Sequence, residues 1–273
     1  MKKALFIFLG LLSFSGLAQK KPALVVGIVV DQMRYEYLNK YYDRYSDKGF
    51  KRLMREGMNC TDNHYNYAPT VTAAGHASVY TGTVPAIHGI VGNDWIEVAT
   101  GKKMYCVDDT TVQTVGSKSK AGLMSPKNMF TSTITDQLKM AQNYKSKTIA
   151  IALKDRGSIL PGGHSANAAY WHDGASGYWI TSTHYMDKLP DWVNEYNALK
   201  VANKFYEQGW STLYPIETYV NSDSNSVSYE GRFKDEKDSS FPHETKQYIG
   251  KNNEMIKSLP YGNTMTIDFA KLA

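Results

Sequence analysis

An unbroken apolar run near the start of the chain constrains the fold more than any other feature. Residues 23–30 are apolar throughout and rich in valine and isoleucine, whose β-branched side chains favour strands. A strand that is apolar on both faces is typical of the buried parallel sheets of α/β proteins. The run ends at Asp31, so this carboxylate is expected at the carboxyl end of the first strand.

Strand and helix patterns alternate along much of the remaining chain, and this alternation predicts an α/β fold. Gly57 is expected to end the helix that precedes it. The elements expected from the sequence are strands at 60–67 and 147–153 and helices at 36–42, 48–56, 133–143, 191–208 and from 261 to the last residue.

Two segments depart from this alternation. Residues 157–190 are rich in glycine, serine and aromatic residues, which indicates short hairpins or an inserted cap. Residues 221–246 are polar and are expected to pass over the surface. Since 273 residues suit one large domain or two small ones, we expect 19–273 to belong to one domain, with cap or insertion segments at about 157–260.

The N-terminus has the composition of a secretory signal peptide. Two lysines precede an apolar run at 4–17, and small residues at 16–18 suit a cleavage site after Ala18. The run is too short to span a bilayer comfortably. We therefore expect residues 1–18 to be removed and the protein to be exported, into a periplasm or the medium, without stable membrane insertion.

Charge and cysteine content restrict the partners. The formal net charge is +5, and no dense block of lysine and arginine occurs, so a nucleic-acid partner is not expected. The two cysteines, Cys60 and Cys106, could pair in an oxidising compartment, and their pairing stays open. Two cysteines do not make a metal site of the CxxC kind.

The stretch around Thr72 predicts a loop that changes abruptly into a helix. Pro69 ends any regular structure before it, and the small residues that follow Thr72 allow close packing. A helix N-terminus has unpaired N–H groups and partial positive charge, which attract anions such as phosphate. Thr72 is therefore either a helix cap or a nucleophile that faces a phosphoryl group.

Asp31 and Asn93 also have two interpretations each. Asp31 is either a turn residue or a metal ligand at the end of the first strand. Asn93 lies beside two glycines in the segment 88–95, where it is either a turn residue or a donor to an oxyanion.

Two cations follow the strand expected at 147–153. Lys154 and Arg156 flank Asp155, and such a pair is usually part of a solvated loop. At the end of a buried strand, however, the planar guanidinium can bridge two phosphoryl oxygens and lysine can add a point charge, while Asp155 can orient one of them. The histidines form no metal-binding pattern and are expected to be structural: His64, His76, His88, His164, His172, His184 and His243.

Four motifs together, at 29–34, 69–76, 89–95 and 153–156, resemble the phosphate-irrepressible (PafA-type) bacterial alkaline phosphatases of the alkaline phosphatase superfamily. The resemblance covers the chain from about residue 23 to its end. It implies an α/β/α sandwich with a central, mostly parallel sheet and a cap-like insertion. It also implies that the C-terminal half of the domain is missing from this chain.

The resemblance implies zinc-dependent hydrolysis of small phosphate monoesters. Thr72 matches the nucleophile that forms a phosphothreonine intermediate, and Asp31 matches a ligand of the zinc ion that also holds Thr72. Asn93, Lys154 and Arg156 match the residues that contact the phosphoryl oxygens. Two zinc ions are implied for a complete site, but the remaining ligands are expected to be absent from this chain, which is therefore expected to be inactive alone.

Two other functions remain open at this point. The first is a phosphodiesterase, nucleotide pyrophosphatase or sulfatase of the same superfamily, although the pair Lys154 and Arg156 favours monoesters, whose phosphoryl group carries more charge. The second is an exported, non-catalytic protein that retains only an anion site. The physiological substrate and the oligomeric state are not determined by the sequence.

Overall fold

The computed structural model describes residues 22–273. It divides into two units, Met1–Arg34 and Tyr35–Ala273, which are described separately. The expected signal peptide, 1–18, lies outside the described residues. In the part of the chain that is described, no helix combines the length and apolarity that a membrane span requires.

The strand expected at 23–30 is not formed. Residues 23–30 have no regular secondary structure, and the side chains of Leu24 and Ile28 are 79% and 78% exposed. The physical reason is the lack of a neighbour, since no described strand pairs with this run and a strand needs hydrogen bonds from an adjacent strand. Asp31 is exposed and lies in a turn, in which the N–H of Met33 donates to the carbonyl of Val30 at 3.4 Å.

The second unit contains a four-stranded sheet in the order β3-β6-β5-β4. Strand β4 (Ile149–Ala152) confirms the strand expected at 147–153 and runs parallel to β5 (Ala168–Asp173), with Ile149 opposite Ala168. Strands β6 (Tyr178–Ser182) and β3 (Thr114–Val115) pair in antiparallel fashion.

The described sheet is therefore mixed, not mostly parallel as expected. The reason is the tight turn between β5 and β6, in which Gly177 N–H donates to the carbonyl of Asp173 at 2.7 Å. A connection this short can join only antiparallel strands. The hairpin confirms the short hairpins expected within 157–190.

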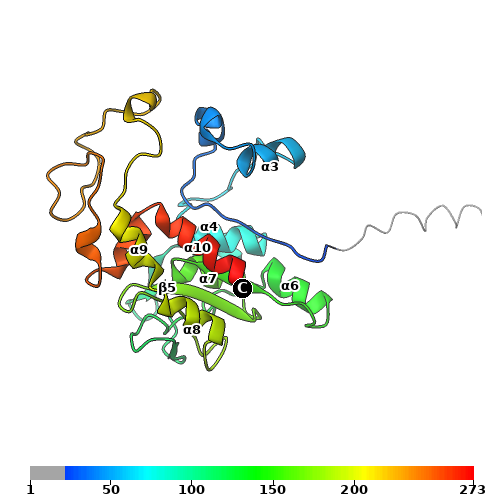
Figure 1. The fold of residues 1–273 in the computed structure, drawn as a ribbon. Helices are drawn as coiled ribbons and strands as arrows, with labels where there is room; N and C mark the ends of the chain where they lie inside the picture. The colour runs from blue at the N-terminus through cyan, green and yellow to red at the C-terminus, as the bar shows by residue number, and fades with distance from the viewer. Residues whose placement is uncertain (1–21) are drawn as a thin grey trace, which may run out of the picture. The chain divides into compact units, whose positions relative to one another are not determined.

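Helices cover both faces of the sheet, which confirms the α/β/α layering (Figure 1). On one face, Tyr170 and Trp179 pack against Phe269 of α10 (Tyr261–Leu272) and the helices α8 (Asp191–Ala198) and α9 (Val201–Gln208). The ring of Phe269 stacks on Trp179 with centroids 4.4 Å apart.

On the other face, alternate residues of β5 pack against two helices. Trp171 and Ala169 contribute to a core with residues of α7 (Asp155–Gly162) and α4 (Thr72–Thr81). Because successive side chains of a strand point to opposite faces, the fully buried β5 connects the two layers. This second face carries the candidate site.

The remaining elements lie around these layers. The helices α3 (Phe50–Glu56) and α6 (Ile134–Ala141), together with α8, α9 and α10, confirm the helices expected at 48–56, 133–143, 191–208 and 261–273. The strand expected at 60–67 is wrong: these residues form bends and irregular backbone, because no strand pairs with them among the described residues. The expected surface excursion at 221–246 has no helix or strand before η3. The elements outside the two layers have the following bounds: α2 Tyr37–Lys40, η1 Tyr42–Arg44, α3 Phe50–Glu56, α5 Pro85–His88, β1 Asp94–Glu97, β2 Lys102–Tyr105, α6 Ile134–Ala141, η2 Ile216–Thr218, η3 Lys246–Tyr248 and η4 Asn253–Ser258.

Candidate active site

Thr72 is the first residue of α4, not its cap. The N-cap position belongs to Val71, whose backbone is extended (φ −72°, ψ 165°) and whose side chain makes no capping bond. Thr72 is half-buried, while the alanines that follow it, Ala73, Ala74 and Ala77, are completely buried. The cap interpretation therefore does not apply, and the expected close packing of this helix is confirmed.

Asn93 lies directly beside this helix start. Its side-chain Oδ1 accepts the backbone N–H of Ala73 at 3.0 Å, and this N–H is one that the first turn of a helix leaves unpaired. Only the oxygen of the amide can accept an N–H, so the NH₂ group of Asn93 points away from the helix. The structure thus brings the amide of Asn93 next to Thr72, although they are far apart in sequence.

His76 belongs to α4 and lies near Gly157 of α7. Its Nδ1 lies 2.8 Å from the carbonyl oxygen of Thr72, a local hydrogen bond within the helix that agrees with the structural role expected for this histidine. Its Nε2 lies 4.0 Å from where a Cβ on Gly157 would stand, and that Cβ would also be 3.2 Å from Cβ of Ala152. The glycine therefore allows the start of α7, which carries Arg156, to lie close to β4, with the ring of His76 at an ordinary packing distance.

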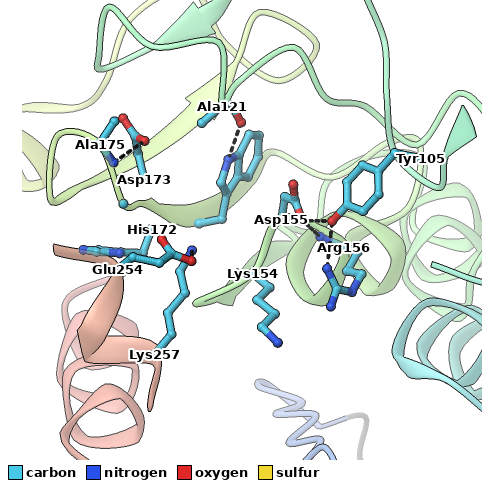
Figure 2. Close-up of a pocket in the computed structure, with 12 residues that line it drawn as sticks. Tyr105, Ala121, Lys154, Asp155, Arg156, His172, Asp173, Ala175, Glu254 and Lys257 are labelled. Atoms are coloured by element: carbon cyan, nitrogen blue, oxygen red, sulfur yellow. Dashed lines mark hydrogen bonds and ion pairs between the residues drawn. The ribbon is translucent and has the colours of Figure 1, made fainter. Parts of the chain in front are cut away.

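Lys154 and Arg156 stand at the beginning of α7, directly after β4. Lys154 is the N-cap residue and is exposed, and Arg156 is half-buried. Both line a cavity of about 420 Å³, and Figure 2 shows their ammonium and guanidinium groups extending from the helix in the same direction. Because the ammonium of Lys154 and the guanidinium of Arg156 both line the cavity, these two cations can bind an anion there.

The guanidinium of Arg156 belongs to a network that the sequence did not predict in full. Arg156 Nη1 donates to the hydroxyl of Tyr105 at 2.9 Å, and that hydroxyl donates to Asp155 Oδ1 at 2.6 Å (Figure 2). Asp155 Oδ1 also accepts the backbone N–H of Arg156 at 2.7 Å. The orienting role expected for Asp155 thus has a geometric basis, but Tyr105 was missed, since nothing near it in sequence indicates its partner.

Burial, hydrogen bonding and charge keep Tyr105 neutral and Arg156 positively charged. Burial, followed by the charge of Asp155, raises the pKa of Tyr105 far above its usual value, so the hydroxyl keeps its proton. Burial lowers the pKa of Arg156, but the hydrogen bond to Tyr105 and the charge of Asp155 outweigh this effect and raise it. Arg156 is therefore a permanent cation.

The opposite wall of the cavity is formed by residues of the segment 157–260, for which the sequence predicted an insertion and no role in the site. His172 of β5 is 2% exposed. Burial, and then the charge of Lys257, lower its pKa to about 4, so it is neutral near pH 7. Lys257 pairs with Glu254 at 2.9 Å. No short motif surrounds these residues, so only the fold could find them.

The described residues do not provide a metal site. They contain no group of three or more His, Cys, Asp or Glu side chains placed to hold a metal ion. Asp31 belongs to the 1–34 unit, so the structure does not place it relative to Thr72. A catalytic zinc ion normally has three protein ligands, and the two candidates, Asp31 and Thr72, do not make a zinc site on their own.

Histidine and cysteine residues near the site are structural here. His88 is completely buried, accepts the N–H of Ile90 at Nδ1 (3.1 Å) and bonds Ser78 Oγ through Nε2 (2.9 Å). Since Nδ1 accepts, Nε2 carries the proton in neutral imidazole and cannot act as a base toward Ser78. Cys60 is exposed, Cys106 is buried, and both are free thiols.

Comparison with known proteins identifies the relatives. The chain matches the family described as type I phosphodiesterase / nucleotide pyrophosphatase over residues 25–255. Alkaline phosphatase PhoV of Synechococcus elongatus is 55% identical over 253 residues, which are 93% of this chain and 46% of PhoV. A protein of Myroides odoratus named calcium-transporting ATPase is 57% identical over 265 residues, 96% of this chain and 48% of that protein. The chain thus spans about half the length of the curated relatives it matches.

Solved structures agree with these sequence similarities. The crystal structure of wild-type alkaline phosphatase PafA matches with a TM-score of 0.91 at 45% identity, covering 93% of this chain and 49% of that chain. A PafA variant in which a threonine, an asparagine, a lysine and an arginine are replaced matches with the same TM-score at 44% identity, covering 93% of this chain and 50% of that chain. The resemblance expected from the four motifs is confirmed, and the chain belongs to the type I phosphodiesterase / nucleotide pyrophosphatase family, with the fold of alkaline phosphatase PafA.

Proposed function

We propose that the protein is an alkaline-phosphatase-type hydrolase that cleaves small phosphate monoesters, with Thr72 as the nucleophile. The observation that carries this proposal is that the groups which the reaction needs stand at the starts of two helices that pack together. Thr72 begins α4 beside Asn93, and Lys154 and Arg156 begin α7, which packs against α4. Two neighbouring cations favour a dianion over a neutral ligand.

The proposed reaction has two steps. The Thr72 Oγ1 loses its proton and attacks phosphorus in line, the P–O bond to the leaving group breaks, and the departing alkoxide takes up a proton, so that the phosphoryl group is transferred to Thr72. Water then cleaves the new P–O bond and regenerates the threonine hydroxyl. In both steps Asn93 donates its NH₂ group to one phosphoryl oxygen, and Lys154 and Arg156 bind the others.

Two zinc ions are part of the proposal, with Asp31 and Thr72 among their ligands. Zinc supplies a Lewis acid that makes a hydroxyl more nucleophilic and stabilises a leaving oxygen. This assignment is supported by the resemblance and by the names of the relatives, not by a set of donors among the described residues. The remaining ligands would have to come from outside the residues described.

We also propose that the protein is exported. The composition of residues 1–18 suits a signal peptide, so we propose a periplasmic or secreted protein. Its proposed partners are small-molecule phosphate monoesters, since the contacts named above all address a phosphoryl group.

A phosphodiesterase is the second candidate, because the matching family takes its name from this activity. Lys154 and Arg156 argue against it, since a diester presents one negative charge and a second substituent where this pair would bind. The four residue types replaced in the PafA variant are the types that this chain has at Thr72, Asn93, Lys154 and Arg156.

The test compares p-nitrophenyl phosphate with its bis-p-nitrophenyl diester, using the protein as its host produces it, supplied with zinc, and not the segment 19–273 expressed alone. We expect higher kcat/KM on the monoester, and Thr72→Ala to lower it by roughly 1,000-fold or more, because the nucleophile is removed. Thr70→Ala is the matched control, since Thr70 belongs to the same motif and is exposed. Faster diester cleavage, or equal losses in both variants, would refute the proposal.

A further inference from the structure

Tyr105 makes the contact that fixes the guanidinium of Arg156. Among the described residues, its hydroxyl is the only group that hydrogen-bonds this guanidinium, while Arg156 Nε is buried without a partner. The hydroxyl has one proton, which it donates to Asp155 at 2.6 Å. Its oxygen is therefore oriented to accept from Arg156, and the bond has a defined direction.

The position of Tyr105 is itself set by the hairpin that carries Asn93. Tyr105 is the last residue of β2 and pairs with Asp94, the first residue of β1. The next N–H along the chain, that of Cys106, donates to the carbonyl of Asn93 at 2.9 Å. One rigid ladder thus holds Asn93 beside Thr72 and Tyr105 beside Arg156.

An arginine side chain loses much rotamer freedom when it binds an anion, and a partner that holds it beforehand reduces this cost. Here the partner contacts one Nη group and leaves other N–H groups of the fork directed elsewhere. Figure 2 shows the guanidinium extending from α7 on the same side as Lys154. Removing the hydroxyl would leave the guanidinium without its hydrogen-bonded support.

We propose that Tyr105 is a positioning residue, which holds Arg156 in the orientation that binds a dianionic phosphoryl group and so contributes to the preference for monoesters over diesters. This inference rests on the proposed function. It assigns to Tyr105 no direct contact with substrate, and its effect must therefore act through Arg156.

The experiment uses Tyr105→Phe in the native protein supplied with zinc. The variant keeps the ring, whose centroid lies 5.9 Å from Arg156 Cζ, and removes only the hydroxyl. Tyr185→Phe is the matched control, since Tyr185 packs at the same core and its buried hydroxyl has no partner among the described residues. We expect Tyr105→Phe to lower kcat/KM for the monoester about 10-fold, and to change diester cleavage by less than about twofold. Tyr185→Phe should leave both near wild type.

A double-mutant cycle with Arg156→Ala separates positioning from general stability. If Tyr105 acts through Arg156, adding Tyr105→Phe to Arg156→Ala causes no further loss. A loss of the same size in both backgrounds, or equal losses on monoester and diester, would overturn the inference. If Tyr105→Phe does not fold, Asp155→Asn weakens the anchor of the hydroxyl and should lower the monoester preference; an unchanged preference overturns the inference.

The outcome also distinguishes this inference from the proposed function. A wild-type protein without monoester preference would contradict both. A wild-type protein that prefers monoesters, loses that preference in Arg156→Ala and keeps it in Tyr105→Phe would contradict the role of Tyr105 alone.

Discussion

His172 shows, at the scale of a single residue, how burial sets an ionisation state beside the proposed site. Both ring nitrogens are buried without a partner among the described residues, and the ring lies edge-on to Trp179 at 6.1 Å. The low pKa of about 4 follows from burial first and from Lys257 second. The folded protein therefore favours the neutral imidazole of His172 over the charged one.

This residue makes stability depend on pH in a definite window. An unfolded histidine has a pKa of about 6.5, so between about pH 6.5 and pH 4 the unfolded state binds more protons and the free energy of unfolding falls as the pH falls. His172→Phe removes this dependence. From about pH 7 to about pH 4.5, wild type should lose about 2 kcal/mol more than the variant in denaturant unfolding. Parallel pH profiles would contradict the expectation.

At the scale of an element, helix α6 depends on one carboxylate at its start. Thr133 and Asp136 form a capping box, with Asp136 N–H donating to Thr133 Oγ1 at 3.1 Å and Thr133 N–H to Asp136 Oδ2 at 2.9 Å. The same carboxylate accepts the N–H and hydroxyl of Ser165 at 2.7 and 2.6 Å. Asp136 thus connects α6 to the loop that follows α7.

Asp136→Ala should therefore destabilise the protein more than the loss of a simple helix cap. It leaves several buried donors unpaired, and we expect the free energy of unfolding to fall by about 3 kcal/mol. Asp191→Ala is the matched control, because Asp191 occupies the first turn of α8 but is exposed, and it should cost less than about 1 kcal/mol. Similar losses in chemical denaturation would show that the network around Asp136 contributes little.

At the scale of the whole molecule, metal binding requires more than the described residues offer. Zinc needs a convergent set of donors, and the described residues contain no such group of three. The chain from residue 19 to 273, purified alone, should therefore retain less than a full pair of zinc ions and show no turnover of p-nitrophenyl phosphate. Two tightly bound zinc ions by elemental analysis, together with turnover, would contradict this.

The accuracy of the sequence predictions follows the range of the interactions. Strand β4 and helices α3, α6 and α10 were predicted because their residues carry local signals, such as Gly57 after α3. The run at 23–30 has an equally clear local pattern but forms no strand, because a strand depends on partners that sequence does not specify. The prediction of a mostly parallel sheet was wrong for β5 and β6, because the turn at Gly177 reverses the chain within a few residues.

The sequence by itself determined which residues stand at the ends of elements: Thr72 at a helix start, and Lys154 and Arg156 after a strand. These positions follow from proline, glycine and apolar runs, whose effects act within one turn or strand. Only the tertiary structure decided that Asn93 binds the start of α4, that Tyr105 holds Arg156 and that His172 is neutral. Hydrogen bonding and burial depend on neighbours in space, and packing of distant segments supplies those neighbours.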